Sequence, residues 1–183
     1  MATKKKMLQA AAGAVGGGWD ISNAEYNGSP VNWLTVSPQD TGGSGVFFKP
    51  DGTSLYLVGY GADAVYSYDL STAWDISTAS YVQSFSVSSQ ETAPQGLTFK
   101  PDGTEMYVVG STSDRVHQYS LSTAWDISTA SSSFSLPVST WETAARSVFF
   151  KPDGTKMYVA GTTGDDVNEF TLSTAWQVNT ASY

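Results

Sequence analysis

Three segments of the chain share one twelve-residue pattern, and their even spacing constrains the fold more than any other feature. The pattern is Phe-Lys-Pro-Asp-Gly-Thr-x-x-Tyr-x-x-Gly, and it covers residues 48–59, 99–110 and 150–161. The glycines of the three Pro-Asp-Gly steps, Gly52, Gly103 and Gly154, are successively 51 residues apart. A fixed period of this length is typical of repeat architectures. The chain is therefore an array of three similar units.

Each copy of the pattern predicts a β-hairpin. A short apolar run leads into Pro-Asp-Gly, and a second apolar run follows at once. Proline presets φ, aspartate can hydrogen-bond to its own backbone, and glycine accepts a positive φ, which together suit a tight turn between two strands.

Each full unit supplies four predicted strands, and their polarity rises in order. The first two are apolar on both faces, as in strands covered by neighbouring sheets. The third mixes apolar and polar residues, and the fourth alternates with serine, which indicates a half-exposed edge strand. The predicted first strands are 46–48, 97–99 and 148–150, and the second strands are 55–58, 106–109 and 157–160. The third strands are 65–70, 116–121 and 167–172, and the fourth strands are 84–87 and 133–136.

Four-stranded units that are buried on one side and wet on the other predict an all-β fold, a β-propeller. The blades are expected at about 45–95, 96–146 and 147–183, within a propeller domain at 19–183. The last unit lacks a fourth strand, and an N-terminal strand at 31–37 has no unit of its own, so the two ends complement each other. Closed propellers usually have four to eight blades. We therefore expect closure by oligomerisation, with six blades from a homodimer; the alternative is a three-bladed or open form docked on other subunits.

Composition excludes several classes of protein. The net charge is −8, and three of the nine basic residues lie in the first six positions, so nucleic acid is not an expected partner. No cysteine is present, which excludes disulfides, thiolate metal sites and thiol nucleophiles. No apolar run is long enough to span a bilayer, so we expect no membrane partner.

Residues 1–18 differ from the rest and predict a docking arm on a glycine hinge, with a cleaved signal peptide as the alternative. The arm would bind through Lys4, Lys5, Lys6, Met7 and Leu8. The segment Lys-Lys-Lys-Met-Leu-Gln-Ala-Ala-Ala-Gly resembles the N-termini of virion structural proteins of tailed bacteriophages. This resemblance implies that the arm binds other virion proteins.

The repeats also resemble those of YVTN and lactonase-like propellers, in which a Pro-Asp-Gly turn precedes a Tyr-Val strand. The segment Leu-Ser-Thr-Ala-Trp-Asp-Ile-Ser-Thr-Ala-Ser, at 70–80 and 121–131, is similar to a repeat that is frequent in phage and environmental bacterial proteins. The resemblance covers residues 19–183 and implies the propeller fold.

Two sets of repeated side chains are candidate sites. Trp74, Trp125 and Trp176 follow the third strands, where they either pack between blades or form stacking platforms for a glycan on a host surface. Acidic residues precede each first strand and either cap a solvated loop or form a ring at the channel mouth that holds a cation or a basic partner. This second set is Asp40, Glu91 and Glu142.

The remaining polar residues give little support for catalysis or metal binding. The single histidine, His117, occupies a position filled by Tyr66 and Asn168 in the other units, so we interpret it as a rim side chain. The acidic pair Asp165-Asp166 is weak support for calcium. No nucleophile elbow, phosphate loop or histidine cluster is present. We expect no catalytic, cofactor-binding or metal-binding residues.

These observations predict a non-enzymatic bacteriophage virion structural protein on the exterior of the particle. It would be a tail-associated platform for assembly and host attachment, or a capsid decoration protein. A lectin-like propeller that uses the repeated tryptophans is the alternative from another class. A lactonase-like hydrolase fragment is the third hypothesis, disfavoured because the units are uniform and their loops short.

Overall fold

Each predicted hairpin forms in the computed structural model, which describes residues 33–183. In the first hairpin the Gly52 N–H donates to the Lys49 carbonyl at 2.8 Å, and Gly52 has a φ of +74°. The Asp51 carboxylate accepts from the Thr53 N–H at 2.9 Å and pairs with the Lys49 ammonium at 2.8 Å. A turn with a proline and a left-handed glycine thus connects the antiparallel strands β1 and β2 through residues 49–53. The turn chemistry read from the sequence is therefore confirmed.

The twelve strands of residues 33–183 form three antiparallel sheets of four strands each, and each sheet keeps the chain order of its strands. A short 3-10 helix, η2 (Ile76–Thr78), η3 (Ile127–Thr129) or η4 (Val178–Thr180), precedes each fourth strand. The sheets are β1 (Gly43–Phe48), β2 (Ser54–Gly59), β3 (Ala64–Leu70) and β4 (Ala79–Ser86); β5 (Pro94–Phe99), β6 (Glu105–Gly110), β7 (Arg115–Leu121) and β8 (Ala130–Pro137); and β9 (Ala145–Phe150), β10 (Lys156–Gly161), β11 (Val167–Leu172) and β12 (Ala181–Ser182).

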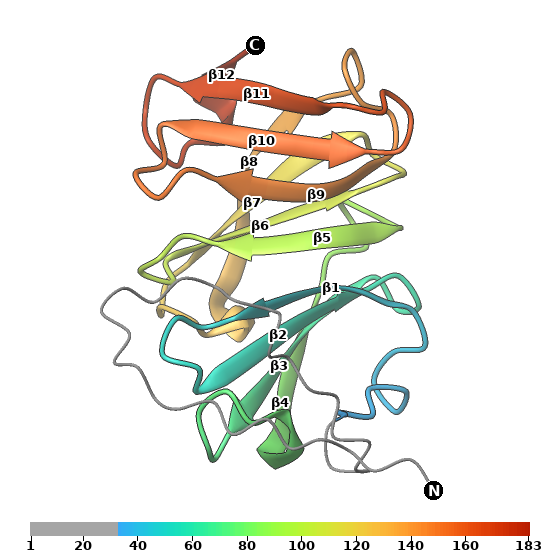
Figure 1. Ribbon diagram of the computed structural model, residues 1–183, viewed down its shortest axis with the longest axis vertical. Helices are drawn as coiled ribbons and strands as arrows, with labels where there is room; N and C mark the ends of the chain where they lie inside the picture. The colour runs from blue at the N-terminus through green and yellow to red at the C-terminus, as the bar shows by residue number, and fades with distance from the viewer. Residues whose placement is uncertain (1–32) are drawn as a thin grey trace, which may run out of the picture. The chain divides into compact units, whose positions relative to one another are not determined.

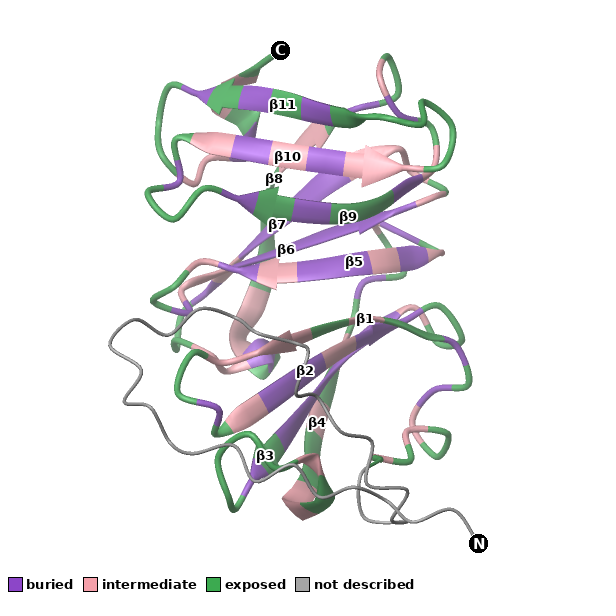
Figure 2. Cartoon of the chain, viewed as in Figure 1, coloured by how far each residue is buried: buried purple, intermediate pink, exposed green. Residues whose placement is uncertain are grey.

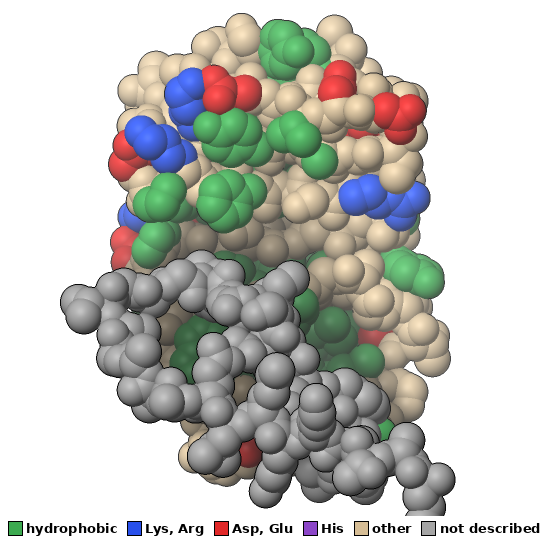
Figure 3. Space-filling view, viewed as in Figure 1, with side chains coloured by type: hydrophobic (Ala, Val, Ile, Leu, Met, Phe, Trp, Pro, Cys, Tyr) green, Lys and Arg blue, Asp and Glu red, His purple; other side chains and the backbone are tan. Residues whose placement is uncertain are grey.

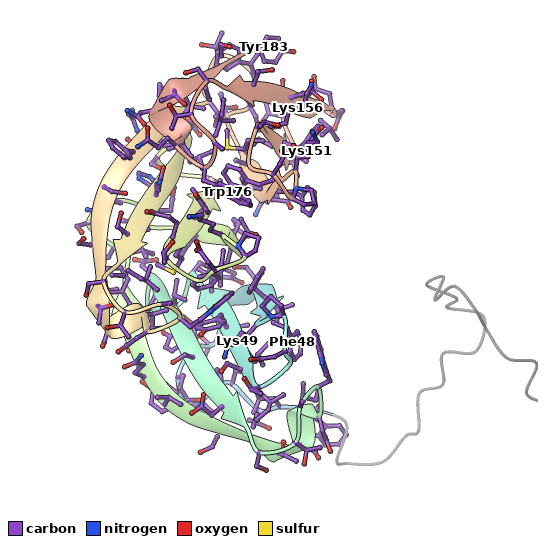
Figure 4. All side chains as sticks on the ribbon, turned by 90° about the vertical axis from the view of Figure 1, so that its left-hand side faces the viewer. Phe48, Lys49, Lys151, Lys156, Trp176 and Tyr183 are labelled. Atoms are coloured by element: carbon purple, nitrogen blue, oxygen red, sulfur yellow. The ribbon has the colours of Figure 1, made fainter. Side chains whose placement is uncertain are left out.

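The sheets stack face to face as three blades of a propeller, in an arc (Figure 1, Figure 4). The first strands, β1, β5 and β9, lie next to one another on the inner side of the arc. The fourth strands β4 and β8 follow its outer side. This arrangement confirms the all-β fold with three four-stranded blades, and it confirms that the first strands are innermost.

The cores lie between the blades rather than within them (Figure 2). Tyr56 of the first blade stacks on Phe99 of the second at a centroid distance of 4.5 Å, and Tyr107 repeats this contact with Phe150 at 4.4 Å. Met106 and Met157 are fully buried in these two cores. Complete burial of such side chains contributes about 1.5 to 3 kcal/mol each, so the contact between blades stabilises the fold.

Two predictions about the strands need correction. Residues 33–37 form no strand in the described part of the chain, and Leu34 and Val36 instead pack on the core of the first blade. The third blade has a short fourth strand of its own, the two-residue β12, which pairs with Thr171 and Leu172. Strand pairing needs a free edge at the right distance, and no such edge lies beside residues 33–37 within the described chain.

The third strands of the first two blades are more buried than their mixed composition indicates, whereas β11 alternates exposed and buried residues. All residues of β3 except Asp69 are buried, and β7 is buried except at its Arg115 and Ser120. The polar groups of Tyr66, His117 and Gln118 form hydrogen bonds inside the blades, which lowers the cost of burying them. The buried hydroxyl of Ser67 has no such partner. The expected docking arm, 1–18, lies outside the described residues.

Candidate functional site

The three repeated carboxylates occupy equivalent positions at one end of the blades, and all three are buried. Asp40, Glu91 and Glu142 have exposed fractions of 4%, 1% and 1%. Each lies in the loop before a first strand and accepts hydrogen bonds from main-chain N–H groups of the loop between the second and third strands of its blade. The carboxylates therefore tie two loops together within each blade.

The environment of Glu91 shows how this is achieved. Its carboxylate accepts from the N–H groups of Ala93 at 2.8 Å, Thr112 at 3.2 Å and Ser113 at 3.1 Å. A Cβ at Gly110 would lie 2.4 Å from the carboxylate carbon, so glycine makes room for the acid at this position. Burial by itself raises the pKa of Glu91, but the Ser113 hydroxyl and the three N–H donors outweigh it, so that the pKa lies below its usual value. Glu91 is therefore ionised at neutral pH.

This geometry differs from a solvated acid that caps a turn. The capping role is confirmed by the N–H donors, whereas the expected exposure of Asp40, Glu91 and Glu142 is wrong, because each carboxylate is enclosed by its two loops. No cation or basic partner tests the hypothesis of an acidic ring, which stays a prediction.

The blades differ in chemistry at one position of the third strand, which is occupied by Tyr66, His117 and Asn168. In the first blade the Tyr66 hydroxyl donates to the Asp40 carboxylate at 3.1 Å. In the third blade the Asn168 amide donates to Asp166 at 2.7 Å. The second blade carries His117 at the same position, so it has an imidazole where the others have groups that stay neutral at physiological pH.

His117 belongs to a three-residue hydrogen-bonded cluster with Ser113 and Glu91. The Ser113 hydroxyl donates to the Glu91 carboxylate at 2.6 Å, and the His117 Nε2 lies 2.8 Å from the same hydroxyl oxygen. Because the serine has a single proton, the bond to Glu91 leaves its oxygen to accept from an Nε2–H tautomer, and Nδ1 is then unprotonated. Burial lowers the pKa of His117, so the imidazole is neutral at pH 7.

The interpretation of His117 as a rim side chain is wrong, since only 4% of the residue is exposed. Sequence reasoning missed the cluster because Ser113 lies in a loop and has alanine and glycine as its counterparts at 62 and 164. The sequence did contain one signal of a special site, because the equivalent positions 66, 117 and 168 carry three different polar residues.

The repeated tryptophans lie on the Pro-Asp-Gly turns. Each has a left-handed φ between 67° and 69°, and each indole covers the turn glycine of its own blade so closely that a Cβ there would overlap the ring. Trp125 and Trp176 also pack on the cores between blades, whereas Trp74 is 58% exposed. Trp125 lines a cavity of about 330 Å³ with Asp69 and Asp126. Packing is thus one role of these residues, and glycan stacking stays a prediction that no ligand tests.

Charged side chains over the third sheet are interleaved with hydrophobic ones (Figure 3). Lys151 pairs with Asp153 at 2.7 Å, and Lys156 pairs with Glu169. Within residues 33–183, no group of three or more His, Asp or Glu side chains could hold a metal ion. The same part of the chain has no helix of the length and hydrophobicity needed to cross a membrane.

The fold and the repeated loops define a β-propeller that is incomplete in the described chain. Residues 45–181 match the family described as Lactonase, 7-bladed beta-propeller, and the chain belongs to this family. No curated protein matches the sequence.

Solved structures of similar fold are larger than this chain. A candidate 6-phosphogluconolactonase of Bacteroides uniformis is 17% identical, with a TM-score of 0.58, and the match covers 76% of this chain and 39% of that one. The periplasmic gluconolactonase of Pseudomonas aeruginosa is 17% identical, with a TM-score of 0.51 and coverages of 72% and 37%. Hydrazine synthase of Kuenenia stuttgartiensis is 19% identical, with a TM-score of 0.55 and coverages of 82% and 36%. The chain thus spans about two fifths of the length of these structures.

These comparisons correct the functional expectation. The chain belongs to a family named for a hydrolase, and several of its structural neighbours are named as lactonases, one of them periplasmic. The prediction of a non-enzymatic bacteriophage virion protein, in the tail or as a decoration protein on the particle exterior, is therefore wrong. The lactonase-like resemblance of the repeats is confirmed, and the phage resemblance of the leader finds no support.

Proposed function

We propose that the chain forms part of a lactonase-type propeller that hydrolyses the cyclic ester of a sugar lactone. Membership of the lactonase family across residues 45–181 supports the class of reaction. The observation that carries the proposal within the chain is the contact of Glu91, Ser113 and His117, which the second blade alone has among the described blades.

Lactone hydrolysis needs a group that takes a proton from water. The water oxygen bonds to the carbonyl carbon, the ring C–O bond breaks, and the ring oxygen receives a proton, so that a hydroxy acid results. A neutral imidazole with one unprotonated nitrogen suits this task near pH 7. Because only 4% of His117 is exposed, this role requires that water reach the imidazole between the two loops. His117 is held in that form because burial lowers its pKa and Ser113 occupies its Nε2.

Glu91 would stabilise the imidazolium that forms when His117 takes the proton. Its negative charge favours protonated His117, which is the direction of its effect on the pKa of the imidazole. Ser113 connects the two groups through contacts of 2.6 Å and 2.8 Å. In a catalytic triad the base lies between the nucleophile and the carboxylate. Here Ser113 lies between Glu91 and His117, so the carboxylate would act on the imidazole through the serine hydroxyl, and water would be the nucleophile.

The experiment is an acid-release assay with glucono-1,5-lactone and 6-phosphogluconolactone at pH 7, corrected for spontaneous hydrolysis. We expect the chain to accelerate hydrolysis of one of these esters. The variant His117→Gln, which keeps a hydrogen-bonding side chain but cannot take the proton, should lose at least about a hundredfold in rate. No acceleration by the folded chain would contradict the proposal.

Tyr66→Phe is the matched control, because it removes the equivalent polar contact in the first blade without touching the imidazole. This variant should retain the activity of the unmodified chain. Equal losses in both variants would show that the contacts support the loops rather than the reaction, and the role of His117 would have to be abandoned.

A further inference from the structure

The two joints between blades repeat the same hydrogen bond. The Tyr56 hydroxyl donates to the Trp125 carbonyl at 2.8 Å, and the Tyr107 hydroxyl donates to the Trp176 carbonyl at 2.7 Å. Both tyrosines are on a second strand, and both tryptophans follow the third strand of the next blade. Each pair of neighbouring blades is therefore joined by the same hydrogen bond, whose donor and acceptor both recur at a spacing of 51 residues.

The third strand supplies another contact across the joint between the second and third blades. The Gln118 amide oxygen accepts from the main-chain N–H of Val178, which begins η4, at 3.0 Å. Gln118 is 2% exposed, so this contact lies inside the joint. Polar groups buried at a joint need such partners, which makes the relative placement of two blades specific.

Among residues 33–183, no preceding blade covers the leading face of the first blade. Val46 is 59% exposed, whereas Leu97 and Val148, its counterparts in the other blades, are 7% and 5% exposed because a preceding blade covers them. An apolar groove of about 750 Å³ runs along this face, lined by Trp33, Leu34, Phe48, Leu55, Leu57 and Ile76 among others. Phe48, Leu55, Leu57 and Ile76 are the repeat counterparts of Phe99, Met106, Val108 and Ile127, which belong to the core between the first and second blades.

The third blade leaves its trailing face open. Phe149 is 60% exposed and Val167 66% exposed, whereas Val65 and Val116, the counterparts of Val167, are fully buried. The edge of β11 is paired with β12 only at Thr171 and Leu172 among the described residues. Exposed apolar faces and open strand edges are typical of protein interaction sites.

We infer that the trailing face of the third blade packs on the leading face of the first blade in a second copy of this chain. Two copies related by a two-fold axis would make this joint twice and form a ring of six blades, within the usual range for closed propellers. A second copy fits both faces, because the residues on each open face are the repeat counterparts of residues that meet at the two joints inside the chain. The inference concerns assembly and does not depend on lactonase activity.

The repeat assigns the contacts of the joint. Tyr158 is the counterpart of Tyr56 and Tyr107, so its hydroxyl would donate to the Trp74 carbonyl of the other copy. Glu169 is the counterpart of Gln118, and its carboxylate would accept from the N–H of Ile76 at the start of the other copy's η2. Within one copy Glu169 binds Lys156 and the Tyr158 hydroxyl, so both Tyr158 and Glu169 would exchange a partner when the joint forms.

The segment before the first blade fits the same joint. Val36, Val87 and Val138 are counterparts, and the carbonyl of each accepts from the main-chain N–H groups three and four residues later. Phe85 and Val87 pack on the second blade as part of the first blade's outer edge, and Leu34 and Val36 occupy the corresponding place on the first blade. In the dimer, residues 33–36 would lie beside β11 of the other copy and extend the short fourth strand of its third blade.

The experiment is light scattering on a size column, with the full chain over a range of concentrations. We expect a mass of twice the 19.5 kDa of one chain. Val46→Asp on the leading face and Phe149→Asp on the trailing face should each shift the protein to monomer. Val82→Asp is the matched control, because Val82 is 47% exposed on the outer strand β4 and should leave the dimer intact.

Mixing the two monomeric variants tests whether the two faces meet each other. A mixed dimer contains one joint with both original side chains and one with both aspartates, so partial dimerisation should return on mixing. A monomer at every concentration of the unmodified chain would overturn the inference. So would a dimer that survives both face substitutions, since the contact would then lie elsewhere.

Discussion

The hydroxyl of Tyr56 donates a hydrogen bond to the main-chain carbonyl of Trp125, which lies 69 residues further along the chain, and the same relationship joins Tyr107 to Trp176. The two bonds connect neighbouring blades inside otherwise apolar cores. Their recurrence means that the blades are held at the same orientation in both joints.

Tyr107→Phe removes the donor of the second joint and leaves the Trp176 carbonyl without it. We expect a loss of about 1 to 2 kcal/mol in the free energy of unfolding, because a buried carbonyl without a partner is costly. Urea unfolding followed by tryptophan fluorescence measures this loss. Tyr81→Phe is the control, since Tyr81 is 44% exposed on β4 and should change stability by less than about 0.5 kcal/mol.

Gly103→Ala tests the contact between the turn and the indole of Trp125. Gly103 has a φ of +75°, and an added Cβ would overlap the ring, so we expect a loss of more than about 2 kcal/mol. In a Trp125→Ala background the overlap is gone, and the same substitution should cost only about 1 kcal/mol for the left-handed backbone. Equal costs in the two backgrounds, measured by urea unfolding, would contradict the contact.

Glu142→Gln tests the carboxylate that ties the loops of the third blade. The carboxylate accepts from the N–H groups of Ala144 at 2.7 Å, Thr163 at 3.2 Å and Gly164 at 3.3 Å, and an amide can replace only one of its two oxygens. We expect a loss of about 1 to 2 kcal/mol at pH 7, measured by urea unfolding.

The effect of Glu142 should also depend on pH. Burial raises the pKa of Glu142, but the N–H donors lower it by more, so the folded pKa lies below the usual value of 4.5. The stabilising effect is present above that value and is lost as the pH falls through the folded pKa. The difference between the native chain and Glu142→Gln should therefore shrink from pH 7 to pH 3; a constant difference would argue against an ionised carboxylate.

His117 should make stability depend on pH in a higher range. Burial lowers its pKa, Glu91 opposes this effect and Arg115 adds to it, and the folded pKa lies below the usual value of 6.5. The unfolded chain therefore binds a proton first, and stability is lost as the pH falls below about 6.5. Thermal unfolding between pH 8 and pH 5 should show a flatter profile for His117→Gln than for the native chain.

The hairpins and the order of strands could be predicted because their causes are local. The turn at Lys49 to Gly52 closes through residues adjacent in sequence, and its chemistry recurs in each unit. The burial of Asp40, Glu91 and Glu142 could not be predicted from the sequence, because each carboxylate is enclosed by two loops that lie about twenty residues apart in the chain. The same holds for the cluster of Ser113 and His117.

The sequence by itself determined the period of 51 residues, the twelve-residue pattern and the polarity of the strands, and hence three propeller blades. Only the tertiary structure decided which polar side chains are buried and which faces stay open. Periodicity states which residues are equivalent, but Val46 and Val148 differ in exposure because a neighbouring blade covers only one of them. Burial is a property of neighbours in space, and a repeat cannot assign it to its first and last members.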